Sequence, residues 1–522
     1  MTSTISDDSF RRRFRTHAVP LCVIALAIGA AYASTWTASY GFMDDYNITF
    51  NSSQHHLRIL QNCIAQGRPL DGVILNAVFG SIHTIAAIAR ARELGQLFIV
   101  IAAFVFYAAM VRTGWPRSLA AGMAVVCGTL PAMQVYAAWG TEVAQPLAAA
   151  AAGMAAILAA SSGEAGIAAG RRWGLRSGAA ASLLAAALIY QPAAMVFWVF
   201  AAIDLLRPNI ARSDSIESTA GTSDLPRAAA RYAIVAAVAM AGAAVALWWG
   251  LRHPVPRLYP GESASERAAL VGLHDLPDKW AFFRTVVGMA MNLTNINTQS
   301  WVAVAVGLLI VTGLPLYARR GSGRWKLLAV AAALVPLTYL PNLVVKNNWP
   351  SFRTQVAIES LVALFVLMAM QGWWQIAAER LGSLSAARAW LPAIWMALLA
   401  GASVFAAADL VKVYFVRPQT TELGLAQHLL NAPELSAASR VKLIGADWSD
   451  TAAPAVYYEE FGQPSSYRPW AGVSMIRLLL AEQHPAYRDL PVDFSASALP
   501  AEPGAMIIDM RQLRGFRNVG GG

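Results

Sequence analysis

Long apolar segments that recur along the chain constrain its fold more than any other feature. A helix needs roughly 20 apolar residues to cross the hydrocarbon core of a bilayer. Segments of this kind lie at 18–36, 94–112, 117–138, 143–160, 229–250, 301–318, 326–342, 354–374 and 389–416. Because 57% of the residues are hydrophobic and only 13% are charged, an ordinary soluble protein of this length is excluded. The sequence predicts a mainly α-helical, polytopic membrane protein.

One further apolar segment, residues 179–206, is interrupted by Tyr190-Gln191-Pro192. A proline breaks a helix, and a polar amide lies beside it in the interior of the segment. The segment is therefore either one tilted helix or two short helices that turn back at the break. Basic residues gather on the cytoplasmic side of a membrane protein. Two short helices keep all the basic loops on that side, namely 11–15, 112–117, 171–176, 207–231, 319–326 and 380–388.

The distribution of basic loops also predicts the topology. It gives about 11 membrane segments, with residues 1–17 in the cytoplasm and the C-terminus on the outer face. The first segment shows no convincing cleavage site, so we expect it to be a retained anchor. The membrane region, 18–416, then carries two long outer loops, 37–93 and 251–300.

Both outer loops contain amphipathic stretches. Leu57, Leu60 and Ile64 recur at helical spacing, which predicts a helix that lies along the membrane surface. The second loop predicts a similar helix from about 280 to 293. Residues 73–89 are apolar enough to suggest a span, but their polar side chains and the topology place them outside the membrane.

The composition changes beyond Pro418. Short strand-like runs at 441–444 and 505–508 alternate with polar and proline-containing stretches, and 421–430 has a helical pattern. We expect residues 417–522 to form a small α/β domain on the outer face.

The positions of the charged residues and of the cysteines argue against a nucleic-acid-binding protein and against a protein built on cysteine metal sites or disulfides. The formal net charge of +10 would suit a nucleic-acid partner, but the arginines lie between apolar segments, where membrane proteins keep cytoplasmic charge. We therefore expect membrane lipids and no nucleic acid. The three cysteines, Cys22, Cys63 and Cys127, lack the spacing of a metal site or a disulfide framework.

Two adjacent carboxylates follow the first segment, in Gly41-Phe42-Met43-Asp44-Asp45-Tyr46. Like charges side by side repel in a low dielectric, so such a pair is usually kept for a proton, a cation or a polar substrate. The alternative is that they are solvated loop acids, or caps for a helix that begins near Tyr46. As functional groups, one carboxylate could take the proton of a sugar hydroxyl. The other could orient the acceptor or hold a divalent cation.

These features together resemble a known family. The acidic pair after the first helix, the amphipathic segment that ends in Gly67-Arg68-Pro69-Leu70, and the Tyr190-Gln191-Pro192 break resemble the Gtr type II glucosyltransferases. That family belongs to the GT-C class of integral membrane glycosyltransferases and modifies O-antigen of lipopolysaccharide or related surface glycans. The resemblance covers about residues 15–416, and the C-terminal domain has no counterpart.

The resemblance implies a function and a location. The chain would lie in the inner, cytoplasmic membrane and transfer a sugar, with glucose expected, from a polyprenyl-phosphate donor to a glycan or lipid-linked glycan on the outer face. Asp44 or Asp45 would be the base, and the resemblance favours Asp44. A lipid phosphate is a good leaving group, so one base and a cation for the phosphate suffice, and direct displacement inverts the anomeric carbon.

Candidate cations for the phosphate lie near the outer ends of the segments. Lys346 and Arg353 flank Asn347-Asn348-Trp349-Pro350-Ser351-Phe352, and we prefer Arg353 because guanidinium binds phosphate in a bidentate manner. Arg58 and Arg68 are second choices. Alternatively, Lys346 and Arg353 extend to lipid headgroups.

Candidate sugar contacts are Tyr46, Tyr190, Gln191 and Glu359. A re-entrant turn needs a polar cavity around its freed backbone, and Gln191 would then face sugar hydroxyls; otherwise the break is only a kink. An ionisable group inside an apolar segment, such as Glu359, suggests function, with a structural ion pair as the alternative. Whether Mg²⁺ or Mn²⁺ takes part stays open.

Two other functions compete. A transporter or flippase would use the broken helix and Glu359 as substrate and coupling sites, although the halves of the chain show no paired repeat. A membrane scaffold would bind a partner through residues 417–522.

Overall fold

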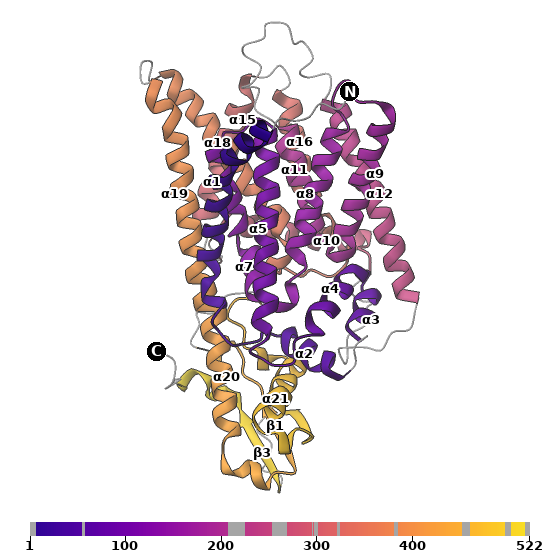
Figure 1. The fold of residues 1–522 in the computed structure, drawn as a ribbon, viewed down its shortest axis with the longest axis vertical. Helices are drawn as coiled ribbons and strands as arrows, with labels where there is room; N and C mark the ends of the chain where they lie inside the picture. Colours follow the sequence, from indigo (N-terminus) through magenta and orange to yellow (C-terminus); the bar gives the residue numbers. More distant parts are fainter. Residues whose placement is uncertain are drawn as a thin grey trace.

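The computed structural model describes residues 7–54, 58–206, 225–252, 269–294, 296, 301–320, 324–380, 385–451, 460–495 and 503–516. A tall helical body carries the C-terminal region at one end (Figure 1). The body's longer helices are α1 (Asp7–Tyr32), α5 (Ile88–Arg112), α6 (Arg117–Gly128), α8 (Gln145–Ser161), α9 (Ala169–Ile189), α12 (Leu225–Arg252), α15 (Trp301–Tyr317), α16 (Arg324–Leu337), α18 (Val356–Arg380) and α19 (Ser385–Val411).

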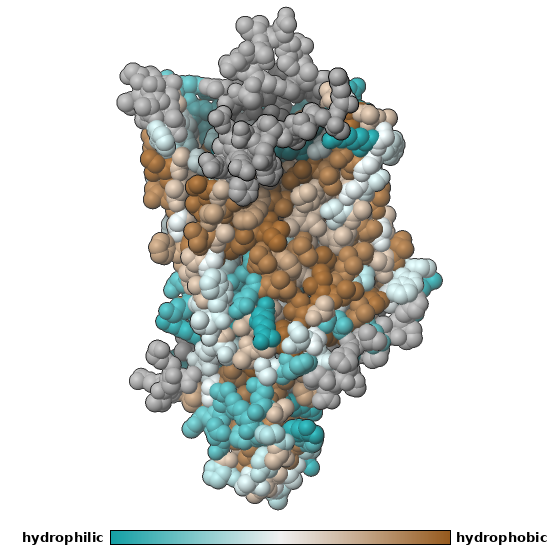
Figure 2. Space-filling model, viewed as in Figure 1, coloured by the Kyte–Doolittle hydropathy of each residue, from teal (hydrophilic) through white to brown (hydrophobic). Residues whose placement is uncertain are grey.

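Six of the described helices are long and apolar enough to cross a membrane. Helix α6 and the short α7 (Pro131–Ala138), bent by 59° at their break, pass the same test together. Large apolar side chains are exposed along these and neighbouring helices, such as Leu26, Val311 and Phe405. Exposed apolar surface of this extent needs lipid around it. Hydrophobic residues gather over the helical body, and hydrophilic ones over the C-terminal region (Figure 2). The chain is therefore a helical, membrane-embedded protein, while the count of about 11 segments stays a prediction.

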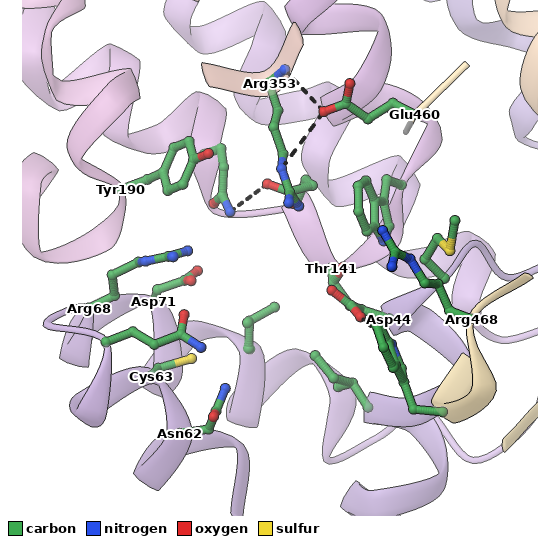
Figure 3. A pocket seen from close by; sticks show the side chains of 18 of the residues that line it. Asp44, Asn62, Cys63, Arg68, Asp71, Thr141, Tyr190, Arg353, Glu460 and Arg468 are labelled. Atoms are coloured by element: carbon green, nitrogen blue, oxygen red, sulfur yellow. Dashed lines mark hydrogen bonds and ion pairs between the residues drawn. The ribbon is translucent and has the colours of Figure 1, made fainter. Parts of the chain in front are cut away.

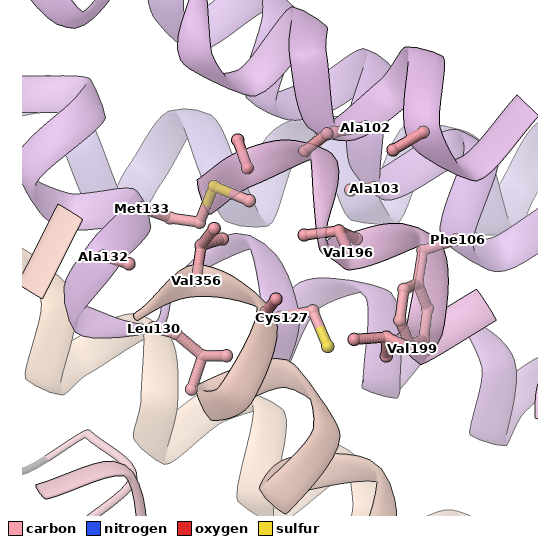
Figure 4. Packing of buried hydrophobic residues seen from close by; sticks show 14 of the residues in the cluster. Ala102, Ala103, Phe106, Cys127, Leu130, Ala132, Met133, Val196, Val199 and Val356 are labelled. Carbon is pink, nitrogen blue, oxygen red and sulfur yellow. The ribbon is translucent and has the colours of Figure 1, made fainter. Parts of the chain in front are cut away.

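Small side chains let the central helices approach closely. Ala102 and Ala103 of α5 lie beside Val196 and Val199 of α11 (Val196–Leu205), and Val356 of α18 lies opposite (Figure 4). All of them are buried in one hydrophobic cluster. Between membrane helices, small residues favour association because backbones come within van der Waals contact.

The chain turns back at Tyr190-Gln191-Pro192. Helix α9 ends at Ile189, a short turn α10 (Gln191–Ala194) follows, and both α9 and α11 pack against α8. Helix α11 leads to the far end of the body, where Tyr232 donates a 2.8 Å hydrogen bond to Asp204 (Figure 1). The backbone thus takes the two-helix alternative rather than the single tilted one.

Shorter helices accompany the long ones. They are α2 (Asp44–Gln54), α3 (Arg58–Ala65), α4 (Pro69–Phe79), α14 (Leu276–Ala290) and α17 (Leu340–Val344). Helix α4 ends at Phe79, so the apolar stretch 73–89 forms no span, as we expected. The described part of the predicted surface helix at 57–64 is α3, with residues 55–57 outside the described chain.

The membrane helix α19 does not stop near Pro418. It continues through one π-helical turn, Lys412–Val416, into α20 (Arg417–Leu430), which includes the predicted helical pattern at 421–430. Proline lacks the N–H that would bond four residues back. The carbonyl concerned, Tyr414 O, instead accepts a 2.9 Å hydrogen bond from Gly462 N. A hydrogen bond from the C-terminal region therefore satisfies the carbonyl that proline cannot satisfy within the helix.

The C-terminal region contains a three-stranded parallel sheet in the order β2-β1-β3. The strands are β1 (Arg440–Ile444), β2 (Val492–Ser495) and β3 (Ala505–Asp509), and α21 (Pro469–Gln483) lies between β1 and β2 in the chain. The predicted strands at 441–444 and 505–508 are confirmed as β1 and β3. Leu443 and Ile508 are buried in the region's core. Helix α21 packs against α2, which brings this domain to the junction.

Arg92, on α5, holds the segment that links α1 to α2. Its side chain is fully buried and donates hydrogen bonds to the carbonyl oxygens of Ala38 (2.6 Å), Tyr40 (2.6 Å) and Thr35 (3.4 Å). The guanidinium also lies 3.9 Å from the centre of the Tyr40 ring. This one cation fixes the path of the backbone just before Asp44.

We expect Arg92→Met to lower the free energy of unfolding by about 3 kcal/mol, because three buried carbonyl groups lose a charged donor. Thermal unfolding of the detergent-solubilised protein, followed by tryptophan fluorescence, measures the change. Arg90→Met, an exposed position on the same helix, is the matched control. Equal melting temperatures for the two variants would contradict this role of Arg92.

Candidate functional site

A pocket of about 150 Å³ lies at the junction of the helical body and the C-terminal region (Figure 3). A space of this size holds several water molecules or a small polar group. Its lining comes from α2, α3, α4, the turn before α8, the end of α9, the loop before α18 and the C-terminal region. The residues are Met43, Asp44, Ile48, Asn62, Cys63, Gln66, Arg68, Asp71, Leu75, Trp139, Thr141, Glu142, Gln145, Tyr190, Trp349, Arg353, Glu460, Arg468 and Trp470.

Asp44 lies in this pocket at the start of α2. The indole Nε1 of Trp470 donates a 3.2 Å hydrogen bond to Asp44 Oδ1. The preceding residue, Met43, has a φ of 46°, a left-handed conformation that is uncommon for a residue with a side chain and often occurs at functional sites. Met43 N donates a 2.9 Å hydrogen bond to Ser465 Oγ, so the C-terminal region helps hold this turn. The backbone here is shaped to present Asp44 to the cavity.

Asp45 points the other way and is fully buried. Its carboxylate accepts hydrogen bonds from the backbone N–H groups of Phe42 (3.0 Å), Gly140 (3.1 Å) and Thr141 (2.8 Å). Burial raises its pKa to about 7, while Arg92 and the three N–H donors act in the opposite direction. Asp45 therefore joins the start of α2 to the turn Gly140–Glu142 and does not line the pocket.

Arg353 lies in the pocket, already paired with two acids. Its Nη1 is 2.6 Å from Glu142 Oε1 and its Nε is 3.8 Å from Glu460 Oε1. Glu460 also accepts hydrogen bonds from Ser351 Oγ and from Phe352 N. Burial raises the pKa of Glu460, and Arg353 opposes the shift. A phosphate at Arg353 would have to share the guanidinium with both carboxylates.

Arg68 and Asp71 form the opposite end of the pocket, on α4. The Arg68 guanidinium lies 5.2 Å from the centre of the Tyr190 ring. Asp71 is 3% exposed, and its Oδ1 has no hydrogen-bond partner among the described residues. Burial raises the pKa of Asp71 to about 7, with Arg68 lowering it and Glu142 raising it.

Four aromatic side chains complete the lining: Trp139, Tyr190, Trp349 and Trp470. Arg353 lies 4.8 Å above the Trp139 ring, and Arg468 lies 5.5 Å from the Trp470 ring. Aromatic walls with a few polar groups are typical of small-molecule sites, and the negative ring faces attract cations and polarised C–H groups. The combination of acids, arginines and aromatic rings suits a polyhydroxylated, phosphorylated ligand.

Besides Asp45, five candidates from the sequence, all in the described chain, lie outside this lining. Tyr46 is buried and its hydroxyl accepts a hydrogen bond from Gly41 N, and Gln191 Nε2 donates to Gly67 O. Arg58 donates to Asn51, Lys346 is exposed, and Glu359 accepts a 3.1 Å hydrogen bond from Ala132 N. The structure therefore brings together Asp44, Arg68, Tyr190 and Arg353.

Sequence reasoning missed Asp71, Trp139, Glu142, Glu460, Arg468 and Trp470. Glu142 precedes an apolar segment, where an acid is expected at the membrane interface, and its pairing with Arg353 depends on the fold. Glu460, Arg468 and Trp470 belong to the C-terminal region, whose contact with α2 has no signature in the sequence. Asp71, an acid within an apolar stretch, was the one available signal.

A metal site was left open. Within the described ranges, no group of three or more histidine, cysteine, aspartate or glutamate side chains is arranged to hold a metal ion.

Comparisons with known proteins add no identity. Neither a protein-family model nor a curated protein sequence matches this chain.

The two adjacent aspartates should differ in their effect on stability. Asp45→Ala removes the acceptor of three buried N–H groups, so we expect it to lower the free energy of unfolding by about 3 kcal/mol. Asp44→Ala should change it by less than about 1 kcal/mol, because Asp44 is only partly buried at a cavity. Thermal unfolding of the purified variants measures both, and an equal loss would contradict the assignment.

Asp45 should also make stability depend on pH. The folded pKa of about 7 exceeds the ordinary value of 3.8, so the folded protein binds the extra proton between these values. The stability contributed by this group is present below about pH 4 and is lost as the pH rises through 7. Between pH 5 and pH 8 the loss is about 3 kcal/mol.

The Asp45→Asn variant lacks this titration, so its deficit relative to the native chain should be smaller at pH 8 than at pH 5. Unfolding curves at the two pH values measure the difference. Asp489→Asn, with a side chain 91% exposed, is the control. A deficit that grows with pH would refute the assigned sign.

Proposed function

We propose that this protein is a membrane glycosyltransferase that uses a polyprenyl-phosphate sugar, with glucose as the expected residue, to modify a cell-surface glycan. One observation carries the proposal. Asp44, but not Asp45, lines a pocket that also contains three arginines and four aromatic side chains, at the boundary between apolar helices and a polar domain. A lipid-linked donor needs access from the membrane, and a glycan acceptor needs access from water.

The chemistry follows from the groups in the pocket. Asp44 takes the proton of an acceptor hydroxyl, and the hydroxyl oxygen forms a bond to the anomeric carbon of the donor sugar. The bond from that carbon to the phosphate oxygen breaks, and the electron pair leaves with the polyprenyl phosphate. The configuration inverts because attack and departure occur on opposite faces. Guanidinium groups stabilise the charge that grows on the leaving phosphate.

The arginines are not equivalent in this scheme. Arg353 is bound to Glu142 and is close to Glu460, so its charge is compensated before a donor arrives. Arg68 lies close enough to Asp71 to lower its pKa, and its buried Nε has no hydrogen-bond partner in the described chain. We therefore give Arg68 the main phosphate contact and Arg353 a supporting one, which reverses the preference from the sequence.

The proposed topology places the pocket on the extracytoplasmic face of the inner membrane, with the N-terminus in the cytoplasm. The support is the position of the basic residues. Arg112 and Arg319, whose side chains pair with Glu164 and Glu379, lie at the ends of α5 and α15 remote from the C-terminal region (Figure 1). Basic ends of this kind belong in the cytoplasm.

A transporter or flippase is the alternative. Its support is Glu359, buried inside α18, and the bent pair α6 and α7. Glu359 is 1% exposed and accepts a hydrogen bond from Ala132, near the start of α7, so a structural role accounts for it. Reconstituted protein that moves a lipid-linked sugar across vesicles without transferring it would favour the transporter.

The proposal predicts that Asp44→Asn lowers the rate of sugar transfer by at least 100-fold, because the base is lost, while the melting temperature stays near that of the native protein. The measurement is mass spectrometry of surface glycan from expressing cells, followed by transfer of labelled sugar by purified protein with EDTA, Mg²⁺ or Mn²⁺. Asp489→Asn is the matched control. Normal glycan modification by Asp44→Asn would refute this mechanism.

A further inference from the structure

We infer that the α4 end of the pocket is the donor half of the site, where Asp71 binds hydroxyl groups of the transferred hexose and Arg68 binds the phosphate. This inference rests on the proposed function and extends it to a residue that neither the sequence motifs nor the mechanism uses. It also assigns a direction to the pocket, with the donor at α4 and the acceptor at the C-terminal region.

The first observation is the state of the Asp71 carboxyl group. It is 3% exposed, lines the cavity, and has an Oδ1 with no hydrogen-bond partner among the described residues. A buried polar atom without a partner costs about 1–3 kcal/mol, so native proteins rarely keep one without a reason. A ligand hydroxyl in the cavity would supply the missing hydrogen bond.

The second observation is that the local structure is built to hold Asp71 there. Helix α4 begins at Pro69, a favoured first position, and Gly72 N donates to Arg68 O. A Cβ at Gly72 would lie 2.8 Å from Cys63 Cβ and 3.0 Å from Leu60 Cα. Glycine therefore lets α4 pack closely on α3. That packing places Asp71 in the same wall as Cys63 (Figure 3).

The third observation concerns the route of a lipid. The turn before α4 packs against the membrane helix α12, since a Cβ at Gly67 would lie 2.9 Å from Leu247 Cβ. One turn further on, a Cβ at Gly250 would meet Ile64 O at 2.1 Å. This end of the pocket thus adjoins apolar helices, whereas the other end is formed by Arg468 and Trp470 of the polar domain (Figure 3).

The chemistry of the pair favours a sugar phosphate over a metal ion. Arg68 beside Asp71 repels a cation and attracts a phosphate, and Tyr190 offers an aromatic face next to it. A carboxyl oxygen accepts hydrogen bonds from sugar hydroxyls. A carboxyl whose pKa is raised to about 7 by burial can also donate one. Asp71 therefore binds the sugar of the donor, and Arg68 binds its phosphate.

The test separates the sugar contact from the phosphate contact. Purified full-length protein in nanodiscs is titrated with glucosyl polyprenyl phosphate and with sugar-free polyprenyl phosphate, and binding is followed by quenching of tryptophan fluorescence. We expect Asp71→Asn to weaken binding of the glucosyl lipid about tenfold, the equivalent of one charge-assisted hydrogen bond. Its affinity for the sugar-free lipid should stay within about twofold of the native value, whereas Arg68→Gln should weaken both.

Each outcome has a definite reading. Equal weakening of both lipids by Asp71→Asn would show a structural role and overturn the inference, as would unchanged binding of both. If the native protein transfers glucose and the Asp71→Asn variant binds the glucosyl lipid normally, the inference is overturned and the proposed function is not. Native protein that binds neither lipid overturns the proposed function as well. Asp489→Asn, which should bind both lipids normally, controls for the effect of an aspartate substitution.

Discussion

The buried carboxylate of Asp45 is the interaction on which the rest of the site depends. It accepts three backbone N–H groups from two parts of the chain that are about a hundred residues apart. One part carries Asp44 and the other carries Trp139 and Glu142. Without this bridge, two walls of the pocket would have no fixed relation to each other. Asp45, the neighbour of the proposed base, thus contributes to the site by fixing the positions of other pocket residues.

The C-terminal region is part of the site rather than an appendage. Ser465 N and Ser466 N donate to Glu422 of α20, which fixes the loop leading to Arg468. Glu460 binds the loop before α18 in the same way. Deleting residues 417–522 would remove a wall of the pocket. Loss of function after that deletion therefore cannot distinguish a transferase from a scaffold, and point substitutions are needed.

Much of the fold follows from the sequence because its causes are local. Apolar length predicts the helical body, and the break at Tyr190-Gln191-Pro192 together with the positions of the basic loops predicts the reversal. Strand-forming runs predict β1 and β3. The sequence predicts the site less completely because the site depends on contacts between residues that are far apart in the chain. Nothing in the local sequence separates Asp44 from Asp45. The helix continues past Pro418, where Tyr414 O accepts a hydrogen bond from Gly462, far along the chain.

In the proposed mechanism, the charge balance of the pocket couples the binding of a proton to the binding of the donor. Four carboxyl groups and three guanidinium groups line it, so with all of them ionised the empty pocket carries one net negative charge. A donor phosphate adds another, which would be repelled unless a carboxyl is neutral. Burial raises the pKa of Asp71 to about 7, so this carboxyl group is the one prepared to hold a proton. In the proposed mechanism, the burial of Asp71 therefore lowers the electrostatic cost of binding an anionic lipid, while Asp44, at the other end of the pocket, stays available as the base.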